Sequence, residues 1–209
     1  MKHSSLAVLI LTVSFILSGC GTMPTERYQE SAWEPHSAQE LEENLQYLGY
    51  TPDELQKIIP LYDLRIKDIP EESSLQILGS VSICDLDFQD MRFLYQDDGK
   101  EVYGLSYCYT QDTPTEQDLI KIHDIYDFIC NHYGDPITEN VSNRVKHYIP
   151  TNENKGYPIY KDFWEVPEYP QVQLSLELQD MSSSKDSRMT IIVVFRQIQI
   201  PNIDTTSGL

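Results

Sequence analysis

Basic residues are scarce in this sequence, and their scarcity argues against one class of partner. The 209 residues contain 15 Lys and Arg against 33 Asp and Glu, so the formal net charge is -18 at pH 7. Residues 28–56 hold seven carboxylates and no Lys or Arg. A protein this acidic is repelled by nucleic acid and by anionic lipid. We therefore predict no nucleic-acid partner and interpret the acidic stretch as a solubilising segment, with a cation-seeking arm as the alternative.

Long apolar runs are also missing, with one exception near the N-terminus. Leu6 to Leu17 is apolar apart from Thr12 and Ser14, and it follows the basic Lys2. A bilayer-spanning helix needs about 20 apolar residues, so this run is too short to cross a membrane comfortably. A basic start followed by a short apolar core is typical of a signal peptide. The alternative, an N-terminal helix buried in the folded domain, fits less well because no polar face interrupts the apolar run.

The end of this run carries a more specific pattern. Leu17-Ser18-Gly19-Cys20 resembles the lipobox of bacterial lipoproteins. The resemblance implies that residues 1–19 are removed and that Cys20 becomes the diacylated first residue of the mature chain. Two acyl chains give stable anchoring, whereas one chain holds a protein weakly. The resemblance therefore implies an extracytoplasmic protein anchored to the cell membrane through the Cys20 lipid, or to an outer membrane if the organism has one, since Gly21 resembles an outer-membrane sorting signal.

Cysteine is rare, which limits cross-linking. Besides Cys20 the chain has only Cys84, Cys108 and Cys130. Three remaining thiols are an odd number, so a complete disulfide framework is excluded. Free cysteines are among the most buried side chains. We expect Cys108 and Cys130 to be buried on the side of the sheet that the long helix covers, with free thiols favoured and a disulfide between them as the alternative.

Recognisable catalytic motifs are absent. The sequence contains no H-E-x-x-H, C-x-x-C, G-x-S-x-G or P-loop pattern. Ser182 to Lys185 matches the S-x-x-K of penicillin-binding proteins, but the S-D-N and K-T-G partners of that motif are missing. We predict that Ser182 lies in a hairpin loop, and we assign no catalytic residue, no metal ligand and no cofactor.

Capping patterns predict three helices in one domain. We divide the chain into the signal peptide 1–19, a lipidated acidic tether 20–36, a domain 37–200 and a flexible tail 201–209. Each predicted helix begins with a capping box, in which a Ser or Thr precedes a Glu by three residues. The third helix is the longest, spans about 114–133 and ends at Gly134. The three boxes are Ser37 to Glu40, Thr51 to Glu54 and Thr113 to Glu116.

Strand patterns surround the long helix. Residues 75–83 form one predicted strand, and residues 91–110 form a hairpin around Asp98-Gly99, a pair that favours a tight turn. After the helix, residues 144–149 and 160–166 are weaker strand candidates, while 172–178 and 189–200 form a second hairpin. This order predicts an α+β fold with a mainly antiparallel sheet and the long helix across one face.

The first hairpin also predicts which side chains share a face. A two-residue turn pairs Tyr95 with Val102 and Phe93 with Gly104, and it places Cys108 on the Phe93 face. The opposite face would then hold Leu94, Tyr103, Leu105, Tyr107 and Tyr109. We expect the two short N-terminal helices, residues 38–59, to cover part of that second face. Tyr107 and Tyr109, at the border of the cover, are the candidate binding residues.

Two further groups of residues suggest chemistry. Asp85, Asp87 and Asp90 are spaced like calcium ligands, but the Gly and Glu of an EF-hand loop are missing, so a strand end with Leu86 inward and the carboxylates outward is the favoured interpretation. His123 lies four residues before Asp127, a spacing compatible with a metal or with a solvated helix face. We predict a non-catalytic binding or interaction module of the cell envelope, with a protein or glycan partner. The alternative is an envelope hydrolase that uses His123 or the carboxylates of residues 85–90.

Overall fold

The computed structural model describes residues 34–58, 65–95, 101–137, 143–150, 159–182, 185 and 187–198. The predictions for the signal peptide, the lipidated cysteine, the Asp98-Gly99 turn and the tail 201–209 lie outside the described residues. No helix in the ranges above is long and apolar enough to cross a membrane.

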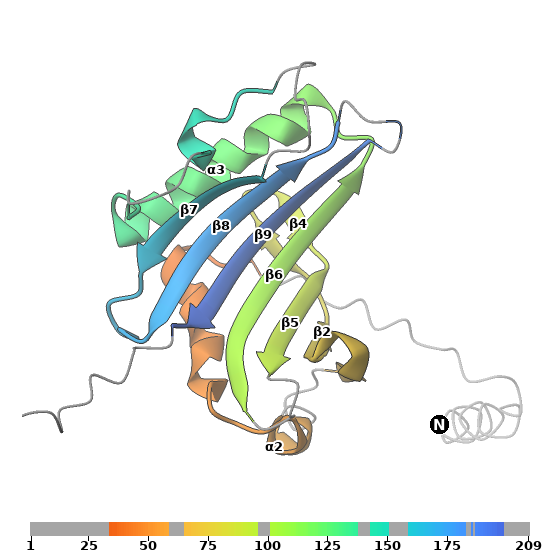
Figure 1. The fold of residues 1–209 in the computed structure, drawn as a ribbon, viewed down its shortest axis with the longest axis vertical. Coiled ribbons are helices and arrows are strands. Elements are labelled where there is room, and N and C mark those ends of the chain that lie inside the picture. The colour runs from red at the N-terminus through yellow and green to blue at the C-terminus, as the bar shows by residue number, and fades with distance from the viewer. Residues whose placement is uncertain are drawn as a thin grey trace, which may run out of the picture.

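The predicted α+β class and the mainly antiparallel sheet are confirmed. Seven strands form one antiparallel sheet in the order β1-β2-β5-β6-β9-β8-β7, and β3 and β4 form a small second sheet. The long helix packs against one face, which we call the inner face; Figure 1 views the sheet from the opposite, outer face. The strands are β1 (Arg65–Ile69), β2 (Ser74–Leu78), β3 (Val81–Ile83), β4 (Leu86–Phe88), β5 (Asp90–Tyr95), β6 (Val102–Asp112), β7 (Ile159–Glu165), β8 (Val172–Asp180) and β9 (Arg188–Gln197).

Of the three predicted capping boxes, one is formed, one is shifted and one is not formed. Ser37 makes no side-chain cap hydrogen bond, and Glu40 Oε2 instead accepts the His36 amide (3.0 Å). The Thr51 box is formed as predicted, because the Thr51 amide donates to Glu54 Oε2 (2.9 Å) and the Glu54 amide donates to Thr51 Oγ1 (3.3 Å). The long helix is capped two residues later than predicted, by Thr115 and Asp118. The predicted Gly134 stop is confirmed. The helices are η1 (Ala38–Tyr47, a 3₁₀ helix), α2 (Pro52–Ile58), η3 (Pro70–Glu72), α3 (Glu116–Tyr133) and η4 (Val145–His147).

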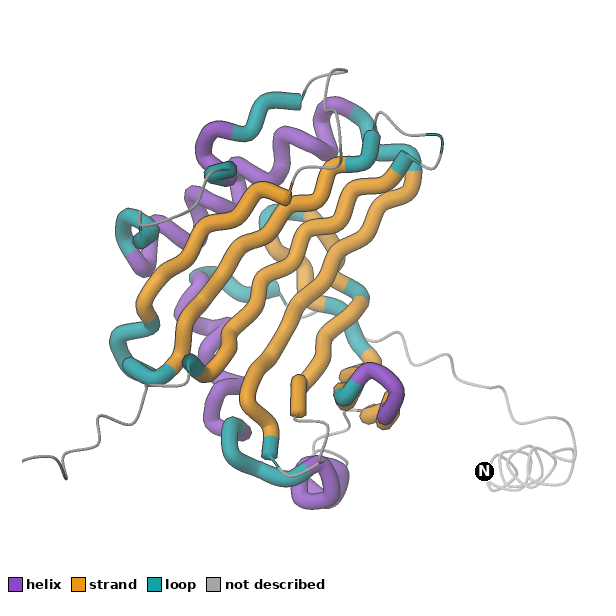
Figure 2. Tube along the Cα trace, in the orientation of Figure 1, coloured by secondary structure: helices purple, strands orange, loops and turns teal. Residues whose placement is uncertain are grey.

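Two strand predictions are corrected. The strand expected over 75–83 is broken into β2 and β3, and β3 leaves the main sheet to pair with β4. The strand expected over 144–149 is instead the short helix η4 and its flanks. Figure 2 shows this segment as helix and loop beside α3. The β7 prediction is confirmed, and so is the second hairpin of β8 with β9.

A bulge in the first hairpin overturns the predicted faces. Tyr95 pairs with Val102 as expected, but the register shifts between Leu94 and Tyr95, so Phe93 pairs with Leu105 instead of Gly104. Because successive side chains point to opposite faces, one extra residue exchanges the faces of everything beyond it. Leu105 and Tyr107 therefore join Phe93 on the inner face, and Cys108 moves to the outer face.

The N-terminal helix η1 lies on the inner face with α3, not on the opposite face as predicted. The Tyr107 hydroxyl donates to the Leu41 carbonyl (3.2 Å), and the Tyr133 hydroxyl of α3 donates to Glu42 Oε1 (2.6 Å). The Tyr47 ring meets the Phe93 ring edge-on at 5.7 Å. The apolar stripe of η1 packs there because the bulge has placed the large β6 side chains on that side. In Figure 1, η1 lies behind the sheet and α2 lies at its lower end.

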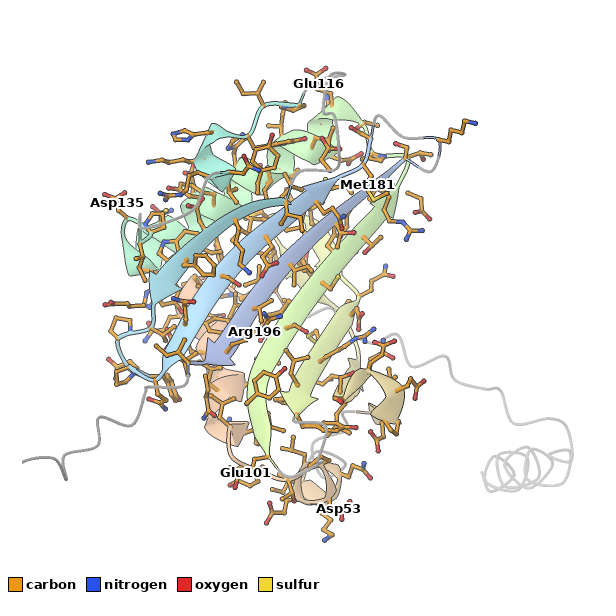
Figure 3. All side chains as sticks on the ribbon, viewed as in Figure 1. Asp53, Glu101, Glu116, Asp135, Met181 and Arg196 are labelled. Atoms are coloured by element: carbon orange, nitrogen blue, oxygen red, sulfur yellow. The ribbon has the colours of Figure 1, made fainter. Side chains whose placement is uncertain are left out.

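The outer face is covered only by its own side chains in the part of the chain that the structure describes (Figure 3). One cross-strand row runs from Gln76 and Arg92 through Ser106 and Val194 to Ser175. The last three are small and only 9%, 1% and 5% exposed. The polar side of the second hairpin is therefore less open to water than the alternating sequence pattern predicted.

Gly104, close to the bulge, provides a test of this register. A Cβ at Gly104 would lie 2.8 Å from the Phe195 carbonyl oxygen on β9, too close for a real contact. We expect Gly104→Ala to lower the free energy of unfolding by about 1–3 kcal/mol in urea denaturation, because backbone atoms must shift. The matched control is Gly79→Ala, whose Cβ would meet only Met91 Cε at 3.7 Å. Equal stability of the two variants would contradict the close approach of β6 and β9.

Candidate functional site

The candidate site is a groove beside the part of β6 that extends beyond the end of β5. Strand β5 begins at Asp90, opposite Cys108, whereas β6 continues to Asp112 with β9 as its only strand partner among the described strands. Figure 2 shows this extension of β6 toward the upper end of the view. A groove of about 600 Å³ opens beside it. We call it the β6 groove; its lining is Gln76, Asp85, Leu86, Asp87, Gln89, Asp90, Cys108, Tyr109, Thr110, Gln111 and Asp118.

The small β3–β4 hairpin forms one wall of the β6 groove. As predicted for a strand end, Leu86 and Phe88 are buried while Asp85 and Asp87 are exposed. The Phe88 ring lies 5.8 Å from the ring of Tyr109, centroid to centroid, which holds β4 against the inner side of β6. The groove therefore brings together the carboxylates of residues 85–90 and one of the two tyrosines that the sequence singled out.

The turn of this hairpin is held in an uncommon conformation. Cys84 and Asp85 both have positive φ angles, 51° and 60°, where turns of this type usually carry Asn-Gly. Lys121 of α3 compensates, because its ammonium donates to the Cys84 carbonyl (3.1 Å) and to Asp85 Oδ2 (3.1 Å). Burial, aided by the Asp124 carboxylate, raises the pKa of the Cys84 thiol to about 11. The thiol is thus protonated at neutral pH and is a poor nucleophile.

Most carboxylates of the β6 groove already have a partner. Asp85 is paired with Lys121. Asp90 accepts both Arg92 Nε (2.7 Å) and Arg92 Nη2 (2.6 Å). Asp118 caps α3, and the hydrogen bonds from the amide and hydroxyl of Thr115 lower its pKa. Asp87 is exposed and has no ion pair within the described residues.

A metal site is not formed by these groups. Throughout the described ranges, no three His, Cys, Asp or Glu side chains lie close enough together to hold a metal ion. The calcium-like spacing of Asp85, Asp87 and Asp90 does not bring them to one point, because Asp85 is drawn to Lys121 and Asp90 to Arg92.

Tyr107 is wrong as a binding candidate, whereas Tyr109 lines the β6 groove. Tyr107 is fully buried; it donates to the Leu41 carbonyl and accepts from Asn44 Nδ2 (3.3 Å). Burial raises the pKa of Tyr107 far above its usual range. Tyr109 is half-buried, and its hydroxyl donates to Gln111 Oε1 (3.3 Å). The register shift explains the outcome, since it turned the Tyr107 ring under η1.

The prediction that Cys108 and Cys130 are both buried under the helix is also wrong. Both are half-buried free thiols, and Cys108 lies on the outer face because of the bulge. The Sγ atom of Cys108 lies 3.9 Å from Thr110 Oγ1, and burial raises the pKa of the thiol. Their assignment as free rather than disulfide-bonded cysteines is confirmed.

His123 belongs to a different environment. Its Nε2 lies 2.8 Å from the Tyr148 carbonyl oxygen, and His123 is not among the residues that line the β6 groove. The Tyr148 hydroxyl donates to the buried Asp180 carboxylate (2.7 Å). Asp127 is exposed, and His123 and Asp127 belong to no group of three possible metal ligands among the described residues. Ser182 lies in the connection between β8 and β9, as predicted, and not at a helix start.

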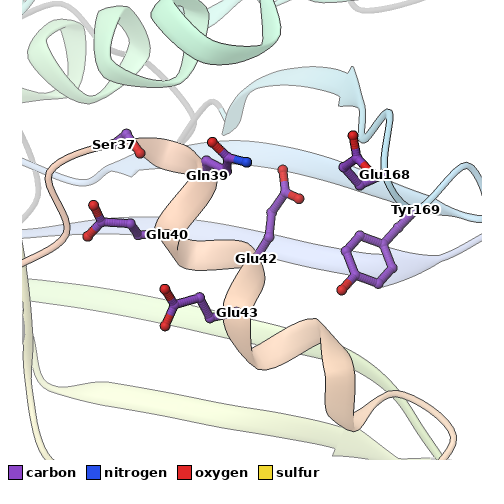
Figure 4. A pocket seen from close by; sticks show the side chains of 7 residues that line it. All are labelled: Ser37, Gln39, Glu40, Glu42, Glu43, Glu168 and Tyr169. Atoms are coloured by element: carbon purple, nitrogen blue, oxygen red, sulfur yellow. The ribbon is translucent and has the colours of Figure 1, made fainter.

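Sequence reasoning missed a second, acidic hollow between η1 and the β7–β8 connection. It measures about 660 Å³, and Figure 4 shows Glu42 directed toward Glu168 and Tyr169. Glu42 is buried and accepts the Tyr133 hydroxyl, so it is a structural link to α3. The run of carboxylates in residues 28–56 was the available signal. The lining is Ser37, Gln39, Glu40, Glu42, Glu43, Glu168 and Tyr169.

In comparisons with known proteins, the chain matches no protein-family model, no curated protein and no solved structure.

Proposed function

We propose that this protein is a non-catalytic binding module of the bacterial cell envelope, anchored through a lipid on Cys20, whose ligand occupies the β6 groove. One observation carries the proposal: the groove combines an aromatic ring, three Gln side chains, carboxylates and a strand edge in one open hollow. Its volume of about 600 Å³ lies within the range of ligand sites. Amides and carboxylates around an aromatic ring suit the recognition of a polar ligand.

The chemistry of the lining supports binding rather than turnover. The only thiol in the β6 groove is Cys108, and burial raises its pKa, so it is largely protonated at neutral pH. Burial likewise raises the pKa of the Tyr109 phenol. No His lines the groove to serve as a general base, and an activated nucleophile normally needs one within hydrogen-bond reach.

The lipobox and the tether give this binding module a location. Residues 20–36 number 17 and separate Cys20 from the start of the predicted domain. A fully extended segment of this length reaches roughly 60 Å. Its net negative charge favours a position away from an anionic lipid surface. We propose that the tether lets the β6 groove meet a partner well above the membrane.

Photocrosslinking tests the location of the ligand site. A benzophenone amino acid replaces Gln111 in the groove or, as a control, the exposed Glu165 on the distant edge strand β7, in cells that make the full chain. We expect irradiation to give an adduct about tenfold stronger from position 111, because a bound partner would lie within reach of it. The substitution Tyr109→Ala is expected to weaken that adduct. Equal adducts from positions 111 and 165, or none from 111, would refute the assignment of the groove.

A further inference from the structure

We propose that the ligand of the β6 groove is an extended basic peptide segment that pairs with the free edge of β6 as an added strand. The inference rests on the proposed function, because it names the class of ligand for the same groove. It is carried by three separate features: unpaired backbone groups on β6, an excess of negative charge, and the contrast with the opposite edge of the sheet.

The first feature is the direction of the backbone groups beyond β5. The Thr113 amide donates to the Ser187 carbonyl (2.9 Å), so Thr113 faces the β9 side. In antiparallel strands, successive residues direct their N–H and C=O groups to alternate sides. Tyr109 and Gln111 therefore face β9 as well, while Thr110 and Asp112 face the side on which β5 lies. Strand β9 gives the same alternation. The Ile198 amide donates to the Gln171 carbonyl on the β8 side (2.8 Å), so Ile191 and Met189, the partners of Tyr109 and Gln111, direct their backbone groups toward β6.

Thr110 and Asp112 lie past the end of β5. The last pair of β5 with β6 is Asp90 with Cys108, so the structure describes no strand on the free side of these two residues. Strand β4 lies close to β6 but does not pair with it, because its strand partner is β3 in the separate small sheet. The N–H and C=O groups of Thr110 and Asp112 are thus presented to the groove, as in proteins that bind peptides by strand addition.

The second feature is charge. Four Asp side chains line the β6 groove. Two of them form ion pairs, Asp85 with Lys121 and Asp90 with Arg92, so negative charge remains in excess. The whole chain carries a formal charge of -18. An acidic surface attracts basic partners and repels acidic ones. The half-buried ring of Tyr109 adds a face on which an ammonium or guanidinium group can rest.

The third feature is that the far edge of the sheet is blocked. On β7, the Ile137 amide donates to the Phe163 carbonyl (2.7 Å), and the Lys161 amide donates to the Asn143 carbonyl (2.9 Å). Proteins commonly cover edge strands in this way, because bare edges pair with other chains. Here the chain covers the β7 edge with its own backbone, whereas no strand among the described residues covers the acidic edge of β6 beyond Cys108.

Defined peptides test the inference on the full chain in detergent. A labelled decapeptide of alternating Lys and Val is compared with its Glu and Val counterpart and with versions N-methylated on either alternate set of residues. We expect the basic peptide to bind about tenfold more tightly than the acidic one. N-methylation of one alternate set should weaken binding about tenfold, and N-methylation of the other set should not, because only one edge of an added strand faces β6.

A variant of β6 removes the same bond from the protein side. Thr110→Pro deletes an N–H that faces the groove and no ladder bond to β9, so it should weaken peptide binding about tenfold with little loss of stability. Thr110→Val keeps the N–H and is the matched control. In the wild-type complex, hydrogen exchange at the Thr110 and Asp112 amides should slow, with no change at Tyr109 and Gln111.

The outcomes separate this inference from the proposed function. Binding that is unaffected by both N-methylated sets and by Thr110→Pro would overturn strand addition. An adduct from position 111 without binding of any peptide would overturn the peptide ligand while leaving the groove as the binding site. Loss of both the adduct and peptide binding would remove the groove assignment itself.

Discussion

Replacing Asp162 by Ala is expected to lower the free energy of unfolding by about 3–5 kcal/mol, the usual cost of leaving a buried charge without its partner. Asp162 on β7 is fully buried and forms an ion pair with Arg144 Nε, where Arg144 is itself only 6% exposed. The other carboxylate oxygen accepts the Val145 amide (2.8 Å) at the start of η4. The substitution would leave the guanidinium without its ion-pair partner, and its Nη2 has no hydrogen-bond partner among the residues that the structure describes. Urea denaturation followed by circular dichroism measures the loss.

The double variant Asp162→Leu with Arg144→Met is the control for this prediction. Replacing both members of a buried ion pair by apolar side chains is often neutral or stabilising. We therefore expect the double variant to recover at least half of the stability that Asp162→Ala loses. A single variant within about 1 kcal/mol of the wild type would show that water reaches the Arg144 guanidinium.

Replacing Cys20 by Ala is expected to abolish membrane anchoring completely, because the lipid has no other attachment point in the lipobox. The variant should remain a longer, unacylated precursor that keeps residues 1–19. Detergent-phase partitioning and mass spectrometry of the N-terminus measure both effects. Cys84→Ala is the matched control and should leave acylation unchanged. A wild-type N-terminus other than acylated Cys20 would overturn the prediction.

The helices η1, α2 and α3 and most strands of the domain could be predicted from local sequence, whereas η3 and η4 were not. The start of α2 depends on Thr51 and Glu54, which lie one helical turn apart, and the end of α3 depends on Gly134. The alternation of β8 predicts its buried side directly, since Val172, Leu174, Leu176 and Leu178 are all buried. These features need only contacts between residues that are close in the chain, so a sequence pattern determines them.

The candidate site was predicted only in part. The sequence indicated Tyr109 as an aromatic residue on a partly covered sheet face, and the carboxylates of residues 85–90 by their calcium-like spacing. It could not show that they line one groove, since the groove exists only because β5 ends at Asp90 while β6 runs on. The sequence also predicted Tyr107 and Tyr109 as equal binding candidates, although Tyr107 is fully buried under η1 and only Tyr109 lines the β6 groove.

By itself, the sequence determined the α+β class, the caps of α2, the long helix and the alternating core strands. Tertiary structure alone decided the register of β6, the side taken by η1 and the pairing of Arg144 with Asp162. One extra residue on β6, Tyr103, opposite the step from Leu94 to Tyr95, exchanged the two faces of β6 and so turned Tyr107 inward. The physical reason is that a strand has a side-chain period of two, so a single extra residue reverses every later assignment, while its local sequence pattern is unchanged.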